Sequence, residues 1–469
     1  MSLPKYNLYH TLLIALLAIC SFIIFFKIGD YPLIDYDEAI YAQVAKESFN
    51  GGNQINLHWL GDDGLYKSGN WFEKPPLMIW LIEAGYLVFG VNEGGARFWV
   101  GVFSLFTIAL TFFYTKTIWG SERAALLSVV AYFLSYHFIY NTSALKLDIP
   151  VGFFIFLSLF LFQTLYNKPN NIFWFWISLA IGVMIKSAIA LLPLMIIFVY
   201  SCVVADFKYL YLKRFWLGFG IFLIIILPWH IQQSVGFGGI FWDEYLSYHM
   251  LNRLTRSVEG SGKNIFYYAN LFYKQGVIFL TFFLLSMGYF TLNALKKRRS
   301  YLFVLIAAVV IVGFFSLAST KMSAYILPLY PYLAIMIAVM INDVLSYIAK
   351  FYPRVSAGLF IIGLSFFVAA GLFGQYKNLQ ARNRTYWQDS KTIGLYLNNH
   401  ETSLPVYYYS KIMQTRPSII FYSDRIIYSL TKKDSNMPKS YLVIVDNNRQ
   451  YSDNKSILTT PTQSIYKIE

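Results

Sequence analysis

Long apolar runs separated by short polar loops dominate this chain of 469 residues. About eleven of the runs approach the ~20 residues that an α-helix needs to cross a bilayer. They are uninterrupted and rich in Leu, Ile and Phe, which indicates helical spans and not the ten-residue alternation of a transmembrane barrel. The predicted spans cover residues 9–27, 97–116, 123–140, 149–166, 171–186, 188–204, 214–231, 271–293, 301–318, 323–345 and 355–375.

Basic loops orient these predicted spans. The run KKRR, residues 296–299, is the clearest cytoplasmic anchor, because short loops rich in Lys and Arg stay on the cytoplasmic side. Alternation of the spans then places four further basic loops on that side, around Lys116, Lys168, Lys208 and Lys350. The assignment requires that residues 77–91 do not cross. This segment is short and contains Glu83, so we predict an interfacial or re-entrant helix that begins after Pro75 and Pro76.

The outer side then carries the loops 28–76 and 232–270 and the polar tail. We predict a transmembrane domain over residues 1–375, whose two outer loops carry the functional site. The tail, residues 376–469, contains the β-like runs VYYYS, SIIFY and YLVIV and predicts a small α/β domain. The first apolar run follows basic Lys5 and precedes no small-residue cleavage site, so we expect it to remain as an uncleaved span.

Composition and charge exclude several classes of protein. Hydrophobic residues make up 57% of the chain and charged residues only 13%, whereas soluble proteins average about 25% charged. The chain is therefore predicted to be an integral membrane protein. Its net charge of +14 does not indicate nucleic-acid binding, because the basic residues cluster in loops between spans. The sequence contains no Walker, Rossmann or zinc-protease motif, so a soluble nucleotide donor is not supported.

Ionisable side chains gather in the predicted outer segments. In DYDEAIYAQVAKESF, Asp37 and Glu38 stand near a helix start, where carboxylates also serve as caps. Asp148 in LKLDIP stands just before a span, and Lys186 separates two long apolar runs. A cap and a snorkelling lysine are the plain alternatives for these two residues. An ionisable group at membrane depth is nevertheless a candidate for function.

The stretch WFEKPPL places Glu73 and Lys74 directly before two prolines. Proline fixes the backbone and stops a preceding helix. We interpret the stretch as a rigid loop that holds both charges toward a reaction site. Preorganised charges of this kind are what a reaction that transfers a charged group requires.

Two more outer segments add cations and histidines. His249 and Arg253 are four residues apart and would share a helix face in WDEYLSYHMLNRLTR. The segment STKMSAYILPLYP would place Lys321 and Tyr325 on consecutive helical turns, and the motif PWH adds His230. A surface helix and a kinked span are the plain alternatives for these two segments.

Carboxylates, cations and histidines on one face suit transfer from a phosphate-linked donor. Carboxylates supply a general base or metal ligands, and cations bind phosphate oxygens and stabilise a departing phosphate. A transporter of lipid-linked sugars would also need outer cations and aromatics. We see no inverted repeat and no series of charges in mid-span to support it. A purely structural subunit would leave the EKPP loop unexplained.

The motifs DEAIYAQVA, WFEKPPL, LDIP, GVMIKSAIALLP, PWH, YHMLNRL and KMSAYILPLYP together resemble one family in order and spacing. It is the bacterial branch of the protein O-mannosyltransferase superfamily (glycosyltransferase family 39/83-like), which includes the 4-amino-4-deoxy-L-arabinose transferases of lipid A. The resemblance covers most of the chain. It implies an all-α polytopic GT-C fold with about 11–13 transmembrane helices and a small soluble α/β C-terminal domain.

The resemblance also implies an activity and a place. Such enzymes lie in the bacterial inner membrane with the active site facing the periplasm, and take a sugar, with inversion, from a polyprenyl-phosphate donor. The acceptor would be lipid A or a related envelope glycolipid or glycan, with a protein acceptor as the alternative and a lipid-linked sugar transporter as the more distant one. Membrane lipid is an expected partner, and nucleic acid is not.

Individual roles follow from the resemblance alone. Asp37 matches the family's catalytic acidic residue, with Glu38 beside it, and Asp148 matches its second outer acidic residue. The residues implied in phosphate or substrate binding are Lys74, Lys186, Arg253, Lys321 and Tyr325. A divalent cation is implied near Glu73 and His249, with His230 as the competing ligand. The aminoarabinose transferases carry an Arg just after their acidic pair, where Ala39 or Ile40 stands here.

Overall fold

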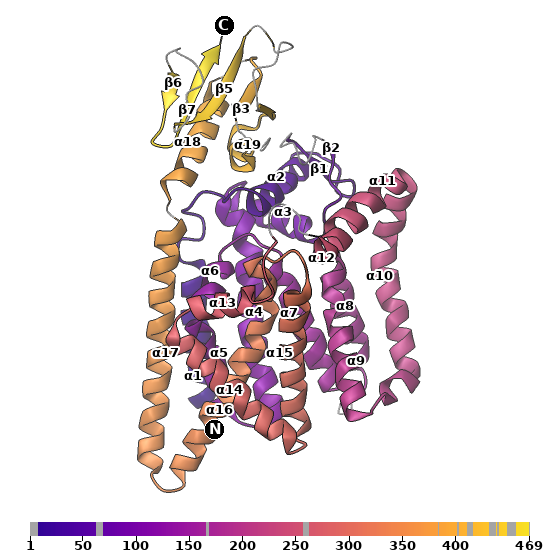
Figure 1. The fold of residues 1–469 in the computed structure, drawn as a ribbon, viewed down its shortest axis with the longest axis vertical. Coiled ribbons are helices and arrows are strands. Elements are labelled where there is room, and N and C mark those ends of the chain that lie inside the picture. Colours follow the sequence, from indigo (N-terminus) through magenta and orange to yellow (C-terminus); the bar gives the residue numbers. More distant parts are fainter. Residues whose placement is uncertain are drawn as a thin grey trace, which may run out of the picture. The chain divides into compact units, whose positions relative to one another are not determined.

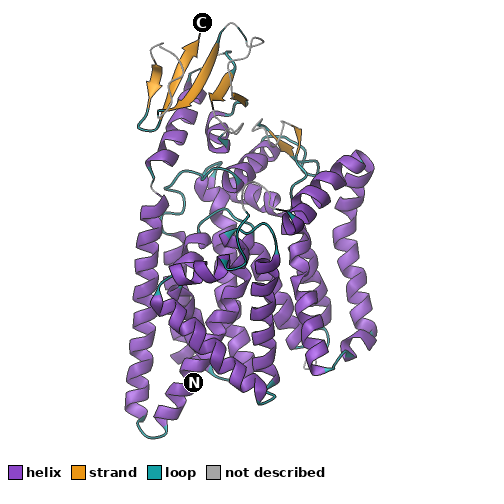
Figure 2. Ribbon diagram, viewed as in Figure 1, coloured by secondary structure: helices purple, strands orange, loops and turns teal. Residues whose placement is uncertain are grey.

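The structure is a computed structural model in which helices predominate (Figures 1 and 2). It describes residues 8–61, 69–165, 168–256, 262–382, 384–400, 403–409, 416–430, 438, 440–447 and 456–468. Parts of both predicted outer loops, residues 62–68 and 257–261, lie outside the described residues. The chain divides into two compact units, Met1–Phe26, Glu73–Pro75 and Val100–Asn378 (the helical unit) and Lys27–Phe72, Pro76–Trp99 and Leu379–Glu469 (the mixed unit).

The helical unit is built from long apolar helices and short connecting turns. Two of its helices, α4 and α17, extend into the mixed unit. In chain order its elements are α1 (Leu8–Phe25), α4 (Glu93–Trp119), α5 (Glu122–Ala131), η1 (Tyr132–Leu134), α6 (Tyr136–Thr142), α7 (Asp148–Gln163), α8 (Asn171–Lys186), η2 (Ser187–Leu191), α9 (Leu192–Val204), η3 (Lys208–Tyr211), α10 (Lys213–Phe237), α11 (Gly239–Trp242), η4 (Asp243–Asn252), α12 (Arg253–Thr255), α13 (Tyr267–Lys274), α14 (Val277–Leu295), α15 (Arg299–Leu317), η5 (Ser323–Leu329), α16 (Tyr330–Ala349) and α17 (Pro353–Arg382).

Eight helical segments among the described residues are long and apolar enough to cross a membrane, or nine if a bent pair in α5–α6 is one span. The sequence predicts about eleven, and two features explain the difference. Helix α7 has only 16 residues. The segment Asn171–Val204 counts once, yet it contains a break where Ser187 adopts φ +59°. A Cβ on Gly182 would lie 2.9 Å from the Cβ of Ala190, so the chain reverses there, as predicted for two antiparallel helices.

Residues 77–91 form the helix α3 (Leu77–Phe89) of the mixed unit. Its 13 residues span about 20 Å, which is too short for the ~30 Å core of a bilayer. The helix begins directly after Pro76 and ends at Gly90, whose φ of +79° suits glycine. A Cβ on Gly85 would lie 2.2 Å from the carbonyl oxygen of Gly95, so only glycine permits this close approach to the start of α4. The length agrees with the predicted interfacial or re-entrant helix.

The mixed unit joins the first loop of the chain to the C-terminal residues. Its other elements are α2 (Asp37–Phe49), β1 (His58–Trp59), β2 (Gly69–Asn70), α18 (Thr385–Asn399), β3 (Val406–Tyr409), α19 (Pro417–Ser423), β4 (Ile427–Leu430), β5 (Tyr441–Asp446), β6 (Ser456–Thr459) and β7 (Gln463–Ile468). The larger sheet has the order β4-β3-β5-β7-β6. Strands β3, β4 and β5 are parallel, and β7 pairs antiparallel with β5 and β6. A small α/β domain is thus confirmed, whereas the predicted division at residue 375 stays a prediction.

One predicted β-like run is wrong. The residues SIIFY lie in the helix α19, which begins at Pro417 and is buried along its whole length. A short apolar run is compatible with a buried strand or a buried helix, so periodicity alone does not separate them. Pro417 favours the helix, because the fixed φ of proline suits the first position of a helix.

Candidate active site

Seven of the predicted site residues form one cluster in the helical unit, which we call the charged cluster. Five different segments of the chain contribute to it. Its members are Glu73 and Lys74 before α3, Asp148 at the start of α7, Lys186 at the end of α8, His249 in η4, Arg253 at the start of α12, and Tyr325 in η5. Asp148, Lys186 and Arg253 lie at helix ends, whereas His249 and Tyr325 lie within the short helices η4 and η5.

The EKPP pair forms the first part of the charged cluster. The Lys74 ammonium lies 2.9 Å from Oε1 of Glu73, and both side chains are more than 90% buried. The Nδ1 atom of His249, also buried, lies 3.8 Å from the same carboxylate oxygen. Buried charges of this kind require paired partners, and the rigid prolines that follow keep the pair in place.

The charges of this pair are set by burial and by each other. Burial alone would raise the pKa of Glu73, but the positive charges of Lys74 and Arg253 outweigh it and hold the pKa at about 2. Burial lowers the pKa of Lys74, and Glu73 opposes this. Burial lowers the pKa of His249 to about 3 despite the facing carboxylate, so the imidazole is neutral near pH 7. Strongly shifted pKa values of this kind are typical of functional sites.

A second ion pair joins α7 to α8. The Lys186 ammonium lies 2.6 Å from Oδ1 of Asp148 and 5.2 Å from the ring centre of Tyr325. The position of Lys186 at the break between α8 and α9 explains this contact, because the helix ends there and its last side chain extends beyond it. The predicted alternatives of a simple cap and a snorkelling lysine therefore do not describe these two residues, which bind each other.

Arg253 connects the two ion pairs. Its Nη1 donates a hydrogen bond of 3.1 Å to the hydroxyl of Tyr325, and its charge acts on both Glu73 and Lys74. The backbone is fixed as well, since the amide of Thr320 donates to the Arg253 carbonyl at 3.0 Å. The charged cluster then holds three cations and two carboxylates around a neutral imidazole. This excess of one positive charge favours an anion.

Two residues of the predicted outer segments, Lys321 and His230, lie in other surroundings. The Lys321 ammonium donates to the carbonyls of Ala318 at 2.6 Å and Lys263 at 3.1 Å. The prediction that Lys321 and Tyr325 lie on consecutive helical turns is wrong, because η5 begins only at Ser323. His230 bonds the Tyr245 hydroxyl at 3.0 Å and the Ile226 carbonyl at 2.7 Å. Of the two competing histidines, His249 is therefore the one beside Glu73.

The acidic pair Asp37–Glu38 belongs to the mixed unit and starts α2, as predicted. Glu38 is buried and accepts hydrogen bonds from Arg97 at 2.7 and 3.2 Å. Asp37 is half-buried and makes no hydrogen bond or ion pair with another described residue. Arg97 therefore binds the Glu38 carboxylate, whereas no described residue binds the Asp37 carboxylate.

Arg97 and Asp35 each make buried contacts that the sequence motifs did not reveal. Arg97 has no exposed surface and lies at the start of an apolar run, where a charged residue is unusual. Asp35 is nearly buried and binds Ser418 and Arg416 of the C-terminal residues. The sequence signal for Arg97 was its position at the edge of a predicted span, while Asp35 had only its acidic character.

The charged cluster does not fit a divalent cation bound by protein side chains alone. Within the described residues, no group of three or more His, Cys, Asp or Glu side chains could hold a metal ion. Glu73 and His249 supply at most two ligands, and the Lys74 ammonium already lies against the carboxylate. A second cation at this position would be repelled by Lys74 and by Arg253.

We therefore expect catalysis to persist when divalent cations are removed. Turnover of the donor in EDTA should stay within about twofold of the untreated protein, because Lys74 and Arg253 supply the positive charge that a metal would bring. The measurement is the initial rate after dialysis against chelator, with added Mg²⁺, Mn²⁺ or Zn²⁺ as the comparison. A loss that one of these metals restores would overturn the expectation.

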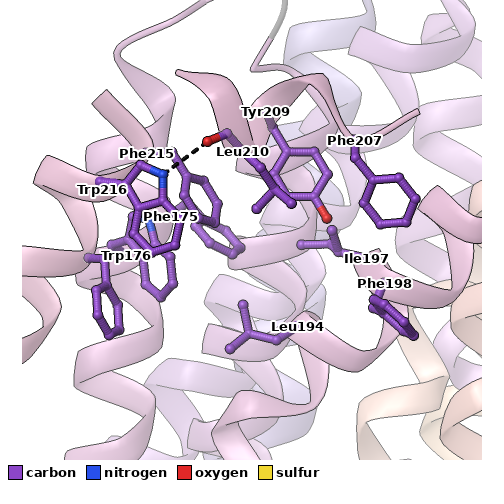
Figure 3. A pocket seen from close by; sticks show the side chains of 11 residues that line it. Phe175, Trp176, Leu194, Ile197, Phe198, Phe207, Tyr209, Leu210, Phe215 and Trp216 are labelled. Carbon is purple, nitrogen blue, oxygen red and sulfur yellow. Dashed lines mark hydrogen bonds between the residues drawn. The ribbon is translucent and has the colours of Figure 1, made fainter. Parts of the chain in front are cut away.

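Two apolar cavities border the membrane helices of the helical unit. An open groove of about 400 Å³ is lined by Met195, Val199, Leu254, Val310, Gly313, Phe314, Leu317 and Ala318. Leu254 directly follows Arg253 in the chain, and it is the lining residue nearest in sequence to the charged cluster. A pocket of about 320 Å³ has aromatic walls that include Trp176, Tyr209 and Trp216 (Figure 3). Trp176 is ten residues before Lys186 on α8, about 15 Å along the helix, so this second pocket lies away from the charges.

Comparisons with known proteins show what the chain is similar to. Residues 14–238 match the family PMT, described as Dolichyl-phosphate-mannose-protein mannosyltransferase. The fold is similar to that of ArnT from Cupriavidus metallidurans bound to undecaprenyl phosphate, with a TM-score of 0.77 over 97% of both chains. The chain therefore has the fold of ArnT and is similar to the PMT family over its first half. The family resemblance and the fold class predicted from the motifs are confirmed. The sequence identity to ArnT is 17%, so that likeness concerns the fold.

Two relatives are similar in sequence over about seven tenths of this chain. An uncharacterized protein from Aquifex aeolicus is 29% identical over 68% of this chain and 62% of its own length. An undecaprenyl phosphate-alpha-4-amino-4-deoxy-L-arabinose arabinosyl transferase from Pseudomonas fluorescens is 26% identical over 72% of this chain and 60% of its own length. The alignments thus cover about six tenths of these relatives. The chain is a multi-pass bacterial membrane protein.

Proposed function

We propose that this protein transfers a sugar, with inversion, from a polyprenyl-phosphate donor to an acceptor of the cell envelope. One observation carries the proposal. Lys74, Lys186 and Arg253 meet in one cluster with an excess positive charge, and each is oriented by a carboxylate or a tyrosine hydroxyl. Buried and preorganised cations are the groups that bind a phosphate and stabilise it as a leaving group.

The leaving phosphate explains why three cations are needed. When the bond between the anomeric carbon and the phosphate oxygen breaks, a phosphodiester becomes a monoester and gains negative charge. Lys74, Arg253 and Lys186 would bind its oxygens, and the Tyr325 hydroxyl would remain bonded to Arg253. Glu73 and Asp148 orient the two lysines, since each lies within 3 Å of its ammonium. The cations therefore need little rearrangement as the charge develops.

The acceptor oxygen attacks the anomeric carbon from the face opposite the phosphate. A hydroxyl acceptor must lose its proton, and Asp37 is our proposed general base, because its carboxylate has no other described partner. A phosphate acceptor is already ionised and needs little base. In that case Asp37 would orient the acceptor or stabilise positive charge at the sugar ring.

The prenyl chain of the donor would lie in the open groove beside Leu254. This groove is apolar and includes Leu254, the residue after Arg253, so we place the first isoprene units of a lipid whose phosphate binds the charged cluster there. Burial of apolar chain contributes about 25 cal/mol per Å². The groove thereby favours a lipid-linked donor over a soluble sugar phosphate.

The side of the membrane and the acceptor complete the proposal. The basic loops around KKRR support a cytoplasmic face opposite the site, and so a periplasmic reaction in the inner membrane. The Pseudomonas fluorescens relative is an aminoarabinose transferase by name, which favours lipid A or a related glycolipid as acceptor. The description of the PMT family favours a protein acceptor instead, and this is the second candidate.

Purified protein in nanodiscs, supplied with radiolabelled polyprenyl-phosphate sugars, tests the proposal. We expect consumption of at least one donor and a labelled product with lipid A, with another glycan or with peptide, and the product identifies the acceptor. Movement of lipid-linked sugar between leaflets, without turnover of any donor, would instead establish a transporter. The reaction must also invert the anomeric configuration, which NMR of the first product shows.

Tyr325→Phe should reduce kcat/KM for the donor about tenfold. The change removes the hydroxyl that binds Arg253 but keeps the ring near Lys186, and a hydrogen bond to a charged group contributes about 1.5–3 kcal/mol. The matched control is Tyr132→Phe, whose buried hydroxyl lies 2.7 Å from Oγ1 of Thr111 and is not a member of the charged cluster. Equal effects of the two changes on kcat/KM would contradict a role for Tyr325 in binding the phosphate.

A further inference from the structure

The loop that precedes α2 is held by buried contacts on both sides of Asp37. All of them lie within the mixed unit. On one side Oδ1 of Asp35 accepts hydrogen bonds from the backbone amide of Ser418 at 2.9 Å and from its hydroxyl at 2.6 Å. Oδ2 of the same residue lies 3.4 Å from Nη1 of Arg416. Asp35 is only 8% exposed, so its carboxylate depends on these partners.

On the other side, Arg97 fixes Glu38 and the start of the loop. Besides Glu38, the guanidinium donates to the backbone carbonyls of Ile28, Tyr31 and Pro32 at 2.8–2.9 Å. Oε2 of Glu38 also accepts the amide of Ile34 at 2.8 Å. One buried arginine thus joins α4 to both ends of the loop. A bidentate guanidinium of this kind gives geometric specificity as well as energy.

Between these contacts the backbone is strained. Tyr36 adopts φ +67° and ψ −124°, which is uncommon for a residue with a side chain. Such a conformation costs about 1–3 kcal/mol and persists only where the surroundings over-determine it. The next residue is Asp37. The strained turn therefore sets the direction in which the Asp37 carboxylate leaves the backbone.

The C-terminal residues supply one side of this arrangement through α19. We call Arg416, Ser418 and Tyr422 the loop anchor. The Tyr422 hydroxyl accepts the amide of Leu33 at 2.8 Å and donates to Glu93 at 2.8 Å. The Arg416 guanidinium stacks 3.7 Å from the ring centre of Tyr386. It also binds Tyr408 and Asp446, so α18, β3 and β5 together orient it.

We infer that Ser418 and Arg416 are positioning residues for Asp37: by holding Asp35, the C-terminal residues fix the strained turn that presents the catalytic carboxylate. This inference rests on the proposed function. It gives residues of the C-terminal α/β region a role in the reaction, and the sequence motifs of the transmembrane segments do not include these residues. The plain alternative is that the contacts only attach these residues to α2.

A pair of substitutions separates positioning from attachment. Asp35→Asn weakens the loop anchor, and Ser418→Ala removes one of its hydrogen bonds. The matched control is Asp424→Asn, which removes the ion pair of Lys46 with Asp424 at 2.5 Å. That pair also joins α19 to α2, but near the far end of α2. The conservative change Ser418→Thr keeps the hydroxyl and should rescue the alanine variant.

The test measures kcat, donor KM and amide hydrogen exchange of residues 31–38. We expect Asp35→Asn and Ser418→Ala to lower kcat roughly tenfold to a hundredfold, since small misplacements have such effects. The donor KM should stay within about twofold, because the cations that hold the phosphate are intact. Amide exchange of residues 31–38 should rise in both variants. Asp424→Asn should change neither kcat nor this exchange, even if it lowers the thermal stability as much as the other two changes do.

Two results would overturn the inference. One is unchanged exchange of residues 31–38 in Asp35→Asn and Ser418→Ala. The other is a kcat that falls in Asp35→Asn and Ser418→Ala only in proportion to the loss of folded protein, and falls by the same amount in Asp424→Asn. A wild-type protein that turns over no donor would instead refute the proposed function, and the exchange experiment would still decide whether the loop anchor holds the turn.

Discussion

Asp37→Asn is expected to lower kcat for a hydroxyl acceptor by about 10²–10⁴, the usual contribution of a general base. The amide has the same size as the carboxylate, and Asp37 has no described partner to lose. Donor KM should therefore change little. The loss of a negative charge at the start of α2 should cost only about 0.3–1 kcal/mol of stability. Steady-state kinetics with a circular dichroism melt checks both parts.

The size of this effect also distinguishes the acceptors. An ionised phosphate acceptor needs no base, so its rate should fall much less than that of a sugar or Ser/Thr hydroxyl. Asp30→Asn is the control, because Asp30 lies in the same loop, is exposed, and among the described residues forms an ion pair only with Lys27, at 3.8 Å. Full activity of Asp37→Asn with every acceptor would remove Asp37 from the reaction and leave the charged cluster as the sole site.

Local patterns in the sequence predicted much of this arrangement. Apolar runs near ~20 residues gave the spans, and the prolines after Lys74 gave the start of α3. The acidic pair gave the start of α2. In each case the signal and the structure lie within one turn or one helix. Asp148 and Lys186 of the charged cluster were found in the same way, as ionisable groups at the ends of apolar runs, where a charge is costly.

Pairings between distant segments were beyond these patterns. Glu38 binds Arg97, which lies 59 residues away, and Asp35 binds Ser418, which lies 383 residues away. No spacing rule connects such residues, because their contact depends on how α2, α4 and α19 pack. Glu38 was therefore predicted beside Asp37 as catalytic, whereas its carboxylate is engaged by a buried arginine.

One backbone break was predicted without a proline or glycine to mark it, because Lys186 separates two long apolar runs. The reversal after Lys186 occurs at Ser187, a residue with no special preference for φ +59°. Lys321 was placed in a helix because the pattern continued, yet its ammonium binds the carbonyls of Ala318 and Lys263. Free carbonyls at the end of α15 need a donor, and this lysine supplies it.

Lys74→Met should reduce donor turnover by about 10²–10³, the effect of losing one preorganised donor to a developing anion. The same change should destabilise the fold by about 3–5 kcal/mol, because it leaves Glu73 buried without its closest cation. A loss of activity in this variant alone would therefore be ambiguous. The double variant Glu73→Gln/Lys74→Met resolves this, since removing both charges restores stability but not the phosphate-binding cation.

The stabilities of the wild type and of Lys74→Met should change in opposite directions as the pH falls. In the wild type the pKa of Glu73 is lowered from 4.5 to about 2, so its stabilising contribution is present above pH 4.5 and is lost as the pH falls toward 2. Without Lys74, burial dominates and raises this pKa above its usual value, so Lys74→Met should gain stability on acidification. The double variant should show neither trend.

Melting curves between pH 3 and 7 measure the three responses, and donor kinetics at pH 7 measure the rate. If Glu73→Gln/Lys74→Met melts like the wild type and turns over donor at the wild-type rate, Lys74 does not bind the leaving phosphate. If it melts like the wild type but stays about 10²–10³ slower, the lysine acts on the reaction and not through the fold. The ion pair then serves to hold a cation ready in a buried place, where an unpaired ammonium would lose its charge.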